Sequence, residues 1–240
     1  MKDTEAKRGV LITAFAGNFM LTLFRLVSLR IIYLTSRHSD IAIFVRLLSI
    51  IPMILITFFT FSLLGYFADR RNLKFRGDQY AKYKKYLKGS GKAMIFFIAL
   101  TAAFVLFCGV LSVIIYSLLG NIMSYDFIKN TIDVLTGVIT LLISPFVLMQ
   151  MLSLLITGLP LRRALRHGFE KARGNYMKLC ALALTFYAAG LLVNLLISNI
   201  SGNADIKLVE IVLYTILGGI STFVMFTYGI NILIKETTER

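Results

Sequence analysis

Long uncharged stretches alternate with short charged ones along the 240 residues of this chain. The uncharged runs cover residues 9–24, 47–68, 93–125, 134–161, 179–204 and 211–234. A helix needs about 20 apolar residues to cross the ~30 Å hydrocarbon core of a bilayer, and five of the six runs reach that length. Segments that face lipid must satisfy their backbone hydrogen bonds internally, so such spans are helices. The pattern therefore predicts an all-α, polytopic membrane protein.

We expect the whole chain, residues 1–240, to form a single six-helix transmembrane domain. Its spans are predicted at about 9–34, 41–67, 93–119, 134–157, 179–200 and 208–234. Composition supports this class, since 58% of the residues are apolar and only 16% are charged. A soluble globule of this size could not hide so many apolar runs, because much of its surface would remain in water.

The distribution of charge predicts the orientation. Residues 69–92 contain nine basic and two acidic residues, and residues 162–178 contain six basic and one acidic. The alternate loops, 35–40, 121–133 and 201–207, are nearly neutral. Because cytoplasmic loops of membrane proteins carry an excess of Lys and Arg, both termini and both basic loops are predicted to be cytoplasmic. The net charge of +14 is then mainly a topology signal, and binding of nucleic acid is not expected.

The first basic loop interleaves Tyr80, Tyr83 and Tyr86 with lysines. A spacing of three places the rings along one side of a helix, which suits an amphipathic segment in the plane of the membrane, with rings at the headgroups and lysines towards anionic lipid. The Gly-Ser-Gly sequence at 89–91 is expected to end this segment before the third span. The alternative is a solvated basic turn that only fixes the topology.

The second basic loop follows a break predicted at residues 158–160, Gly-Leu-Pro, and reads LRRALRHGFEKARGNYMK. It is predicted to be a second basic amphipathic helix on the cytoplasmic side. The candidate membrane-surface residues of the two loops are Arg70, Arg71, Lys82, Lys84, Lys85, Arg162, Arg163, Arg166 and Arg173.

Arg25, Arg30, Arg37 and Arg46 fall in or beside the outer half of the predicted membrane region, where the loops are otherwise nearly neutral. An intramembrane arginine costs at least ~2.5 kcal/mol at a helix centre, so it normally has a partner. Glu210, at the start of the last span, is the best-placed acid. We expect Arg25 or Arg46 to pair with Glu210 around a polar cavity open to the outside. Arg25, Arg30, Arg46 and Glu210 are thus the candidate residues for binding an anion or a lipid on the outer side.

The length of the first span stays open. Asn18, Thr22 and Arg25 follow at i, i+4 and i+7 and share one helical face, and a polar face on a membrane helix usually points into the bundle. Apolar residues continue to Leu34, so the span can be full length. Alternatively it ends near Arg25, and residues 25–37 lie along the outer interface.

The chain contains the trace of an internal repeat. Gly65 follows Pro52 by thirteen residues, and Gly158 follows Pro145 by the same number. The repeat would relate the second and third spans to the fourth and fifth. Because the offset between the copies contains two spans, the repeat would be parallel in the membrane, as in several transporter folds. An old duplication in a protein that transports nothing would leave the same pattern.

Reactive side chains are few. His38 and His167 are predicted on opposite sides of the membrane, so they cannot share a metal ion. Cys108 and Cys180 lie in or beside apolar spans without C-x-x-C spacing, which is typical of free thiols. No phosphate-binding loop, nucleophile elbow or HExxH motif is present. We therefore expect no catalysis, no metal and no cofactor.

One series of residues matches a known pattern: Ser144-Pro145-Phe146-Val147-Leu148, Ala164, Gly168, Ala172-Arg173-Gly174-Asn175, Lys178-Leu179 and Leu184-Thr185-Phe186. Through them the chain resembles, over about two thirds of its length, a widespread group of six-helix bacterial membrane proteins. The group is common in Firmicutes and is similar to the membrane domain of some glycerophosphodiester phosphodiesterases. Gly168 stands where the group has serine and Ala172 where it has methionine, and the group's Pro-Tyr element near the last span is missing. The resemblance implies six helices in the bacterial inner membrane, and it transfers no active site because the group has no established one.

Two functions remain open at this point. In the first, a non-catalytic membrane protein binds anionic lipid, or a membrane protein partner that the sequence does not identify, through its basic cytoplasmic helices. In the second, the chain is a transporter or permease component with an outward-facing site for an anionic substrate.

Overall fold

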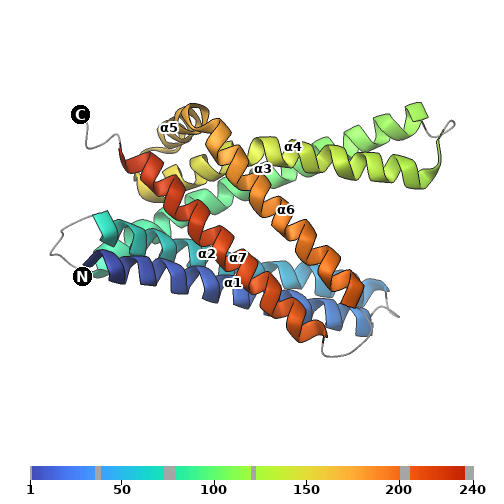
Figure 1. Ribbon diagram of the computed structural model, residues 1–240, viewed down its shortest axis with the longest axis horizontal. Helices are drawn as coiled ribbons and strands as arrows, with labels where there is room; N and C mark the ends of the chain where they lie inside the picture. Colours follow the sequence, from blue (N-terminus) through green and yellow to red (C-terminus); the bar gives the residue numbers. More distant parts are fainter. Residues whose placement is uncertain (1, 36–38, 73–78, 120–122, 201–205, 236–240) are drawn as a thin grey trace.

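The computed structural model describes residues 2–35, 39–72, 79–119, 123–200 and 206–235, which form seven helices and no strand (Figure 1). The helices are α1 (Lys2–Thr35), α2 (Ser39–Asn72), α3 (Gln79–Leu119), α4 (Tyr125–Ile156), α5 (Leu161–Gly174), α6 (Tyr176–Ile200) and α7 (Ile206–Lys235). All of them except α5 contain a stretch that is long and apolar enough to cross a membrane. The predicted all-α architecture with six candidate spans is confirmed.

The start of α3 differs most from the prediction. The helix has 41 residues and runs without interruption through residues 89–91, where a break was expected. Gly89 lies so close to the end of α4 that a Cβ atom at this position would be 2.7 Å from the carbonyl oxygen of Leu155. Close packing therefore outweighs the ~1 kcal/mol that a helical glycine costs. Tyr86, expected at the membrane surface, is instead buried, with its ring edge-to-face against Tyr66.

The predicted break between the fourth span and the second basic segment is confirmed. Helix α4 ends at Ile156, and α5 begins at Leu161. Between them Gly158 has a φ of +65°, a conformation that costs glycine little and other residues more. Gly65, the position matched to Gly158 by the repeat spacing, lies inside α2. The two matched positions thus differ in conformation.

Helix α1 continues through Arg25 to Thr35 without a break. Its stretch of membrane-spanning hydropathy covers Lys7–Ser28. The helix therefore does not end near Arg25, whereas the stretch that is apolar enough to span a membrane ends at Ser28. Where the membrane span itself ends stays a prediction.

The core lies at one end of the molecule. We call it the α5 end; there α1 begins, α7 ends and α5 lies across the end of α4 (left in Figure 1). The main cluster of buried side chains joins five of the spanning helices and α5 at this end. Its members are Val10, Ala14, Leu64, Ala68, Met149, Leu152, Leu155, Ala172, Leu179, Phe226, Ile230 and Leu233.

Away from the α5 end the helices diverge (Figure 1). Helices α1, α2 and α7 run together on one side, with α1 packed against both α2 and α7. Helices α3 and α4 form a long hairpin that points away from them, and α6 crosses between the two groups, touching α4 and α7. The fold is thus a wedge, tightly packed at the α5 end and open towards the far end.

Candidate functional site

Helix α5 rests on α4 through three small, buried residues placed one turn apart, Ala164, Gly168 and Ala172. A Cβ atom at Gly168 would lie 2.6 Å from the Cα atom of Gln150 and 2.7 Å from the carbonyl oxygen of Met149. Ordinary carbon contacts are about 3.5–4.0 Å. Only a glycine lets the two backbones approach so closely, so Gly168 determines where α5 packs against α4.

An aromatic stack supports the same helix from the side. The ring of Phe146 on α4 lies 5.0 Å from that of Phe169 on α5 and 5.3 Å from that of Tyr176 on α6, centroid to centroid. Such pairs contribute about 0.5–1.5 kcal/mol beyond the area they bury. The stack ties α5 and the start of α6 to the same part of α4.

A serine–histidine pair also joins α4 to α5. The Oγ atom of Ser153 lies 3.4 Å from Nδ1 of His167. Burial lowers the pKa of His167 below its usual 6.5, Lys171 lowers it further, and Glu170 opposes both. The Ser153 side chain is completely buried, so no substrate can reach its hydroxyl group. The pair therefore holds two helices together and is not arranged as a nucleophile and base.

The opposite side of α5 carries the charge. Arg162, Arg163, Arg166 and Arg173 are all exposed, and we call this set the arginine face. With 3.6 residues per turn, the four arginines fall within about 100° of arc, centred opposite the three small residues. Arg166 forms an exposed ion pair with Glu170, with Nε 2.9 Å from Oε1. Such a pair contributes little to stability, but it offsets one of the positive charges.

Lysines of α3 lie against the turn that leads into α5. The Nζ atom of Lys92 is 3.5 Å from the carbonyl oxygen of Leu159, in the turn that leads into α5. Lys84 and Lys85 are exposed about two turns earlier on α3. The two basic segments of the sequence therefore meet at the α5 end. The candidates whose side chains lie outside the described part of the structure are Arg70, Arg71 and Lys82.

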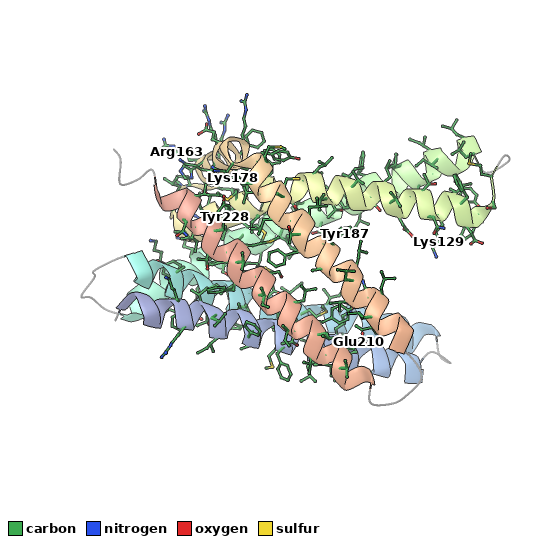
Figure 2. All side chains as sticks on the ribbon, in the orientation of Figure 1. Lys129, Arg163, Lys178, Tyr187, Glu210 and Tyr228 are labelled. Atoms are coloured by element: carbon green, nitrogen blue, oxygen red, sulfur yellow. The ribbon has the colours of Figure 1, made fainter. Side chains whose placement is uncertain are left out.

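Of the four residues of the predicted outer-side site, only Arg25 and Glu210 have described side chains. Arg25 is exposed and Glu210 is half-buried, and no ion pair joins them. The side chains of Arg30 and Arg46 lie outside the described residues. Figure 2 shows Glu210 near the far end of α7, and Arg163 and Lys178 at the α5 end. The outer-side and α5-end candidates are thus separated by most of the length of the bundle.

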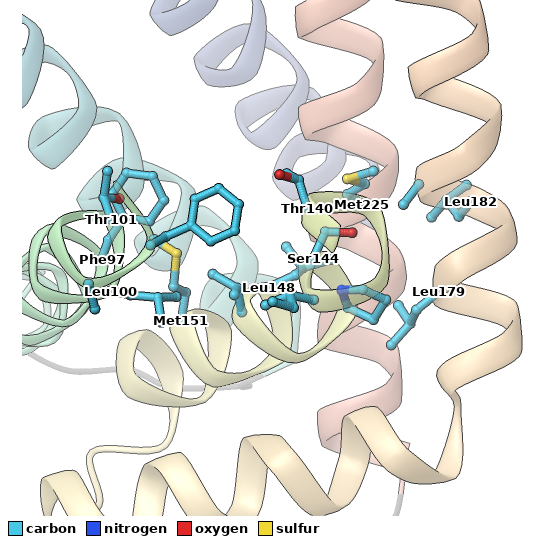
Figure 3. Close-up of a pocket in the computed structure, with 16 residues that line it drawn as sticks. Phe97, Leu100, Thr101, Thr140, Ser144, Leu148, Met151, Leu179, Leu182 and Met225 are labelled. Carbon is cyan, nitrogen blue, oxygen red and sulfur yellow. The ribbon is translucent and has the colours of Figure 1, made fainter. Parts of the chain in front are cut away.

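A pocket of about 490 Å³ lies where the α3–α4 hairpin diverges from α6 and α7 (Figure 3). Helix α4 forms its floor through Leu148 and its neighbours, α3 contributes Phe97 and Phe104, α6 contributes Leu182, and α7 contributes Met225. No residue that lines the pocket is charged. An anion placed in this pocket would lose its hydration without gaining a charged partner.

The few hydroxyl groups in the pocket are mostly satisfied by their own helix. Thr140 donates a hydrogen bond of 2.7 Å to the carbonyl oxygen of Thr136, and Ser144 donates one of 2.9 Å to that of Leu141. Thr101 is the third hydroxyl-bearing residue of the lining. The pocket, which we call the apolar pocket, therefore presents mainly hydrocarbon to whatever enters it.

The described ranges contain no group of three or more His, Cys, Asp or Glu side chains able to hold a metal ion. Cys108 and Cys180 are free thiols and are both half-buried.

Sequence reasoning found the arginines of α5 but missed what holds them in place. The spacing of Ala164, Gly168 and Ala172 at i, i+4 and i+8 was a usable signal for a close helix contact. The pairing of Ser153 with His167 and the apolar pocket had no such signal, since both depend on how distant helices pack.

Comparison of the chain with protein-family models, with curated proteins and with solved structures found no match. The family resemblance therefore remains an expectation from the sequence.

Proposed function

We propose that this chain is a non-catalytic, multi-pass membrane protein that binds anionic lipid headgroups through the basic surface at its α5 end. In this proposal the α5 end faces the cytoplasm with both termini, because that placement puts both basic segments on the side that the positive-inside rule favours. The resemblance noted above makes a bacterial inner membrane the expected location.

The observation that carries the proposal is the rigid placement of the arginine face. Four exposed arginines, with a single acid on the same helix surface, are held by a glycine contact, an aromatic stack and a serine–histidine pair. A segment that only fixed topology would need its charge but not this fixed orientation. Each basic residue near an anionic surface adds about 1 kcal/mol of attraction, so several together give a marked lipid preference.

The test is electron paramagnetic resonance of spin-labelled lipids around the reconstituted protein. Labelled phosphatidylglycerol should associate with the protein more strongly than labelled phosphatidylcholine. Replacing Arg162, Arg163 and Arg173 with glutamine should remove most of that preference and leave the pair of Arg166 with Glu170 intact. Lys129→Gln is the matched control, since Lys129 lies towards the far tip of the α3–α4 hairpin (Figure 2). Equal association of the two lipids with the unmodified protein would refute the proposal.

The transporter alternative has less support. Of its two expected pairs, Arg25 with Glu210 is not formed, and the side chain of Arg46 lies outside the described residues. The apolar pocket also offers an anion no charged group. Saturable uptake of an anion into proteoliposomes, absent from protein-free vesicles, would favour it over the proposal made here.

A further inference from the structure

We infer that the apolar pocket holds one acyl chain of an anionic phospholipid, with the headgroup of that lipid bound by Lys178. The inference rests on the proposed function, because it takes the same class of lipid. It goes further by assigning one lipid to a specific place between α3, α4, α6 and α7.

The chemistry of the lining selects hydrocarbon. Phe97, Leu148, Leu182 and Met225 face the space from four different helices, as Figure 3 shows. Water enters a cavity only where two to four polar partners are available, and the hydroxyls here are few and largely bonded to their own helix. In a bilayer the available apolar molecule is a lipid chain.

The shape and position of the pocket suit a chain lying along the membrane normal. Its lining on α4 extends from Thr140 to Met151, about 17 Å at 1.5 Å per residue. This stretch lies wholly inside the candidate span Tyr125–Ile156. Helices α3 and α6 line opposite sides of the pocket without packing along each other, so a chain can enter between them from the bilayer.

Lys178 supplies the charge at the α5 edge of the pocket. It is exposed, and it precedes the lining residue Leu179 directly. It also precedes Leu182 by four residues, so the two side chains lie on the same side of α6, with Lys178 one turn nearer the α5 end. A phosphate at this lysine would therefore stand directly above a chain in the pocket.

The chain contains no tryptophan, so one introduced tryptophan reports its own surroundings without background. Met225→Trp places the reporter in the pocket, and Leu182→Trp is a second reporter in case the first variant does not fold. Leu192→Trp is the matched control on an exposed position of α6 outside the pocket lining. The probes are phosphatidylglycerol and phosphatidylcholine with bromine atoms on the acyl chains, which quench tryptophan fluorescence on contact.

We expect the pocket reporters to be quenched at lower fractions of brominated phosphatidylglycerol than of brominated phosphatidylcholine, by about fivefold. One basic residue near a lipid surface supports a preference of that size. The Leu192→Trp control should respond equally to both lipids. Adding Lys178→Gln to a pocket reporter should bring its two quenching curves together.

Three outcomes would overturn the inference. Pocket reporters that neither lipid quenches would mean that no lipid chain enters, as when a second copy or another helix fills the space. Equal quenching by both lipids would mean that charge does not select the occupant. A preference that survives Lys178→Gln would place the headgroup elsewhere.

Failure here is distinguishable from failure of the proposed function. If the pocket reporters show no preference while spin-labelled lipids still distinguish phosphatidylglycerol, the arginine face binds lipid and the pocket does not. If neither measurement shows a preference, both proposals fail.

Discussion

Replacing Gly168 with alanine is expected to loosen α5 from the bundle. The added Cβ atom would lie 2.6 Å from the Cα atom of Gln150, 2.8 Å from its backbone nitrogen and 2.7 Å from the carbonyl oxygen of Met149. These are backbone atoms that cannot swing aside, so α5 must move by about 1 Å to reach ordinary contact distances. Overpacking of this kind typically costs about 1–3 kcal/mol. Part of the cost is offset, because alanine favours a helix over glycine by about 1 kcal/mol.

Gly174→Ala gives the matched control. Gly174 lies on the same helix, and a Cβ atom there would meet nothing within 4 Å. Hydrogen exchange of the α5 amides measures the free energy of local opening directly. Relative to Gly174→Ala, the Gly168→Ala variant should lose about 1–3 kcal/mol, which is about a 5- to 150-fold loss of protection. Equal protection of α5 in the two variants would refute the close contact on which the fixed arginine face depends.

Three further predictions concern the α5 contact, the packing of α1 against α7, and the topology. Because burial lowers the pKa of His167, the folded protein should favour the neutral imidazole. The hydrogen-exchange protection of the α5 amides should therefore fall as the pH drops below about 6.5, and His167→Gln should remove that pH dependence. The Nδ2 atom of Asn18 donates a hydrogen bond of 3.0 Å to Thr222, so Asn18→Leu and Thr222→Val should show a coupling of about 0.6 kcal/mol in a double-mutant cycle of unfolding, whereas additive effects would exclude the bond. Cysteines at Lys84 and Ser124 should react with impermeant reagents only from opposite faces, and labelling of both from one face would overturn the proposed orientation.

The spans were predictable because they depend on local composition. Five of the six uncharged runs are long enough on their own to require a membrane, and the break before α5 is set by Gly158 and Pro160. The stretch at 89–91 also contains glycines, although no proline, and a break was expected there; α3 continues through it. The difference lies in tertiary packing. The backbone of α4 lies against Gly89, and it can approach so closely because Gly89 has no side chain. Local sequence carries no information on that contact.

The candidate site was predictable only in part, for a related reason. Charge runs identified Arg162, Arg163 and Arg173, since exposed arginines need no partner to be recognised. The expected pairing of Arg25 or Arg46 with Glu210 assumed that charges within one half of the membrane find each other. The structure leaves Arg25 exposed and unpaired with Glu210, and the side chain of Arg46 lies outside the described residues. The apolar pocket arises from the divergence of helices far apart in the sequence. Such a space follows from helix crossing and not from any one segment.

The salt dependence of lipid selectivity tests the central claim most directly. Salt shortens the distance over which surface charges attract each other, from about 30 Å at 0.01 M salt to about 3 Å at 1 M. The preference of the unmodified protein for spin-labelled phosphatidylglycerol should therefore fall steeply over this range. The variant with Arg162, Arg163 and Arg173 replaced by glutamine should start low and give a nearly flat curve. If the two proteins give the same curve, the arginine face does not bind anionic lipid, and its charge serves only the topology of the chain.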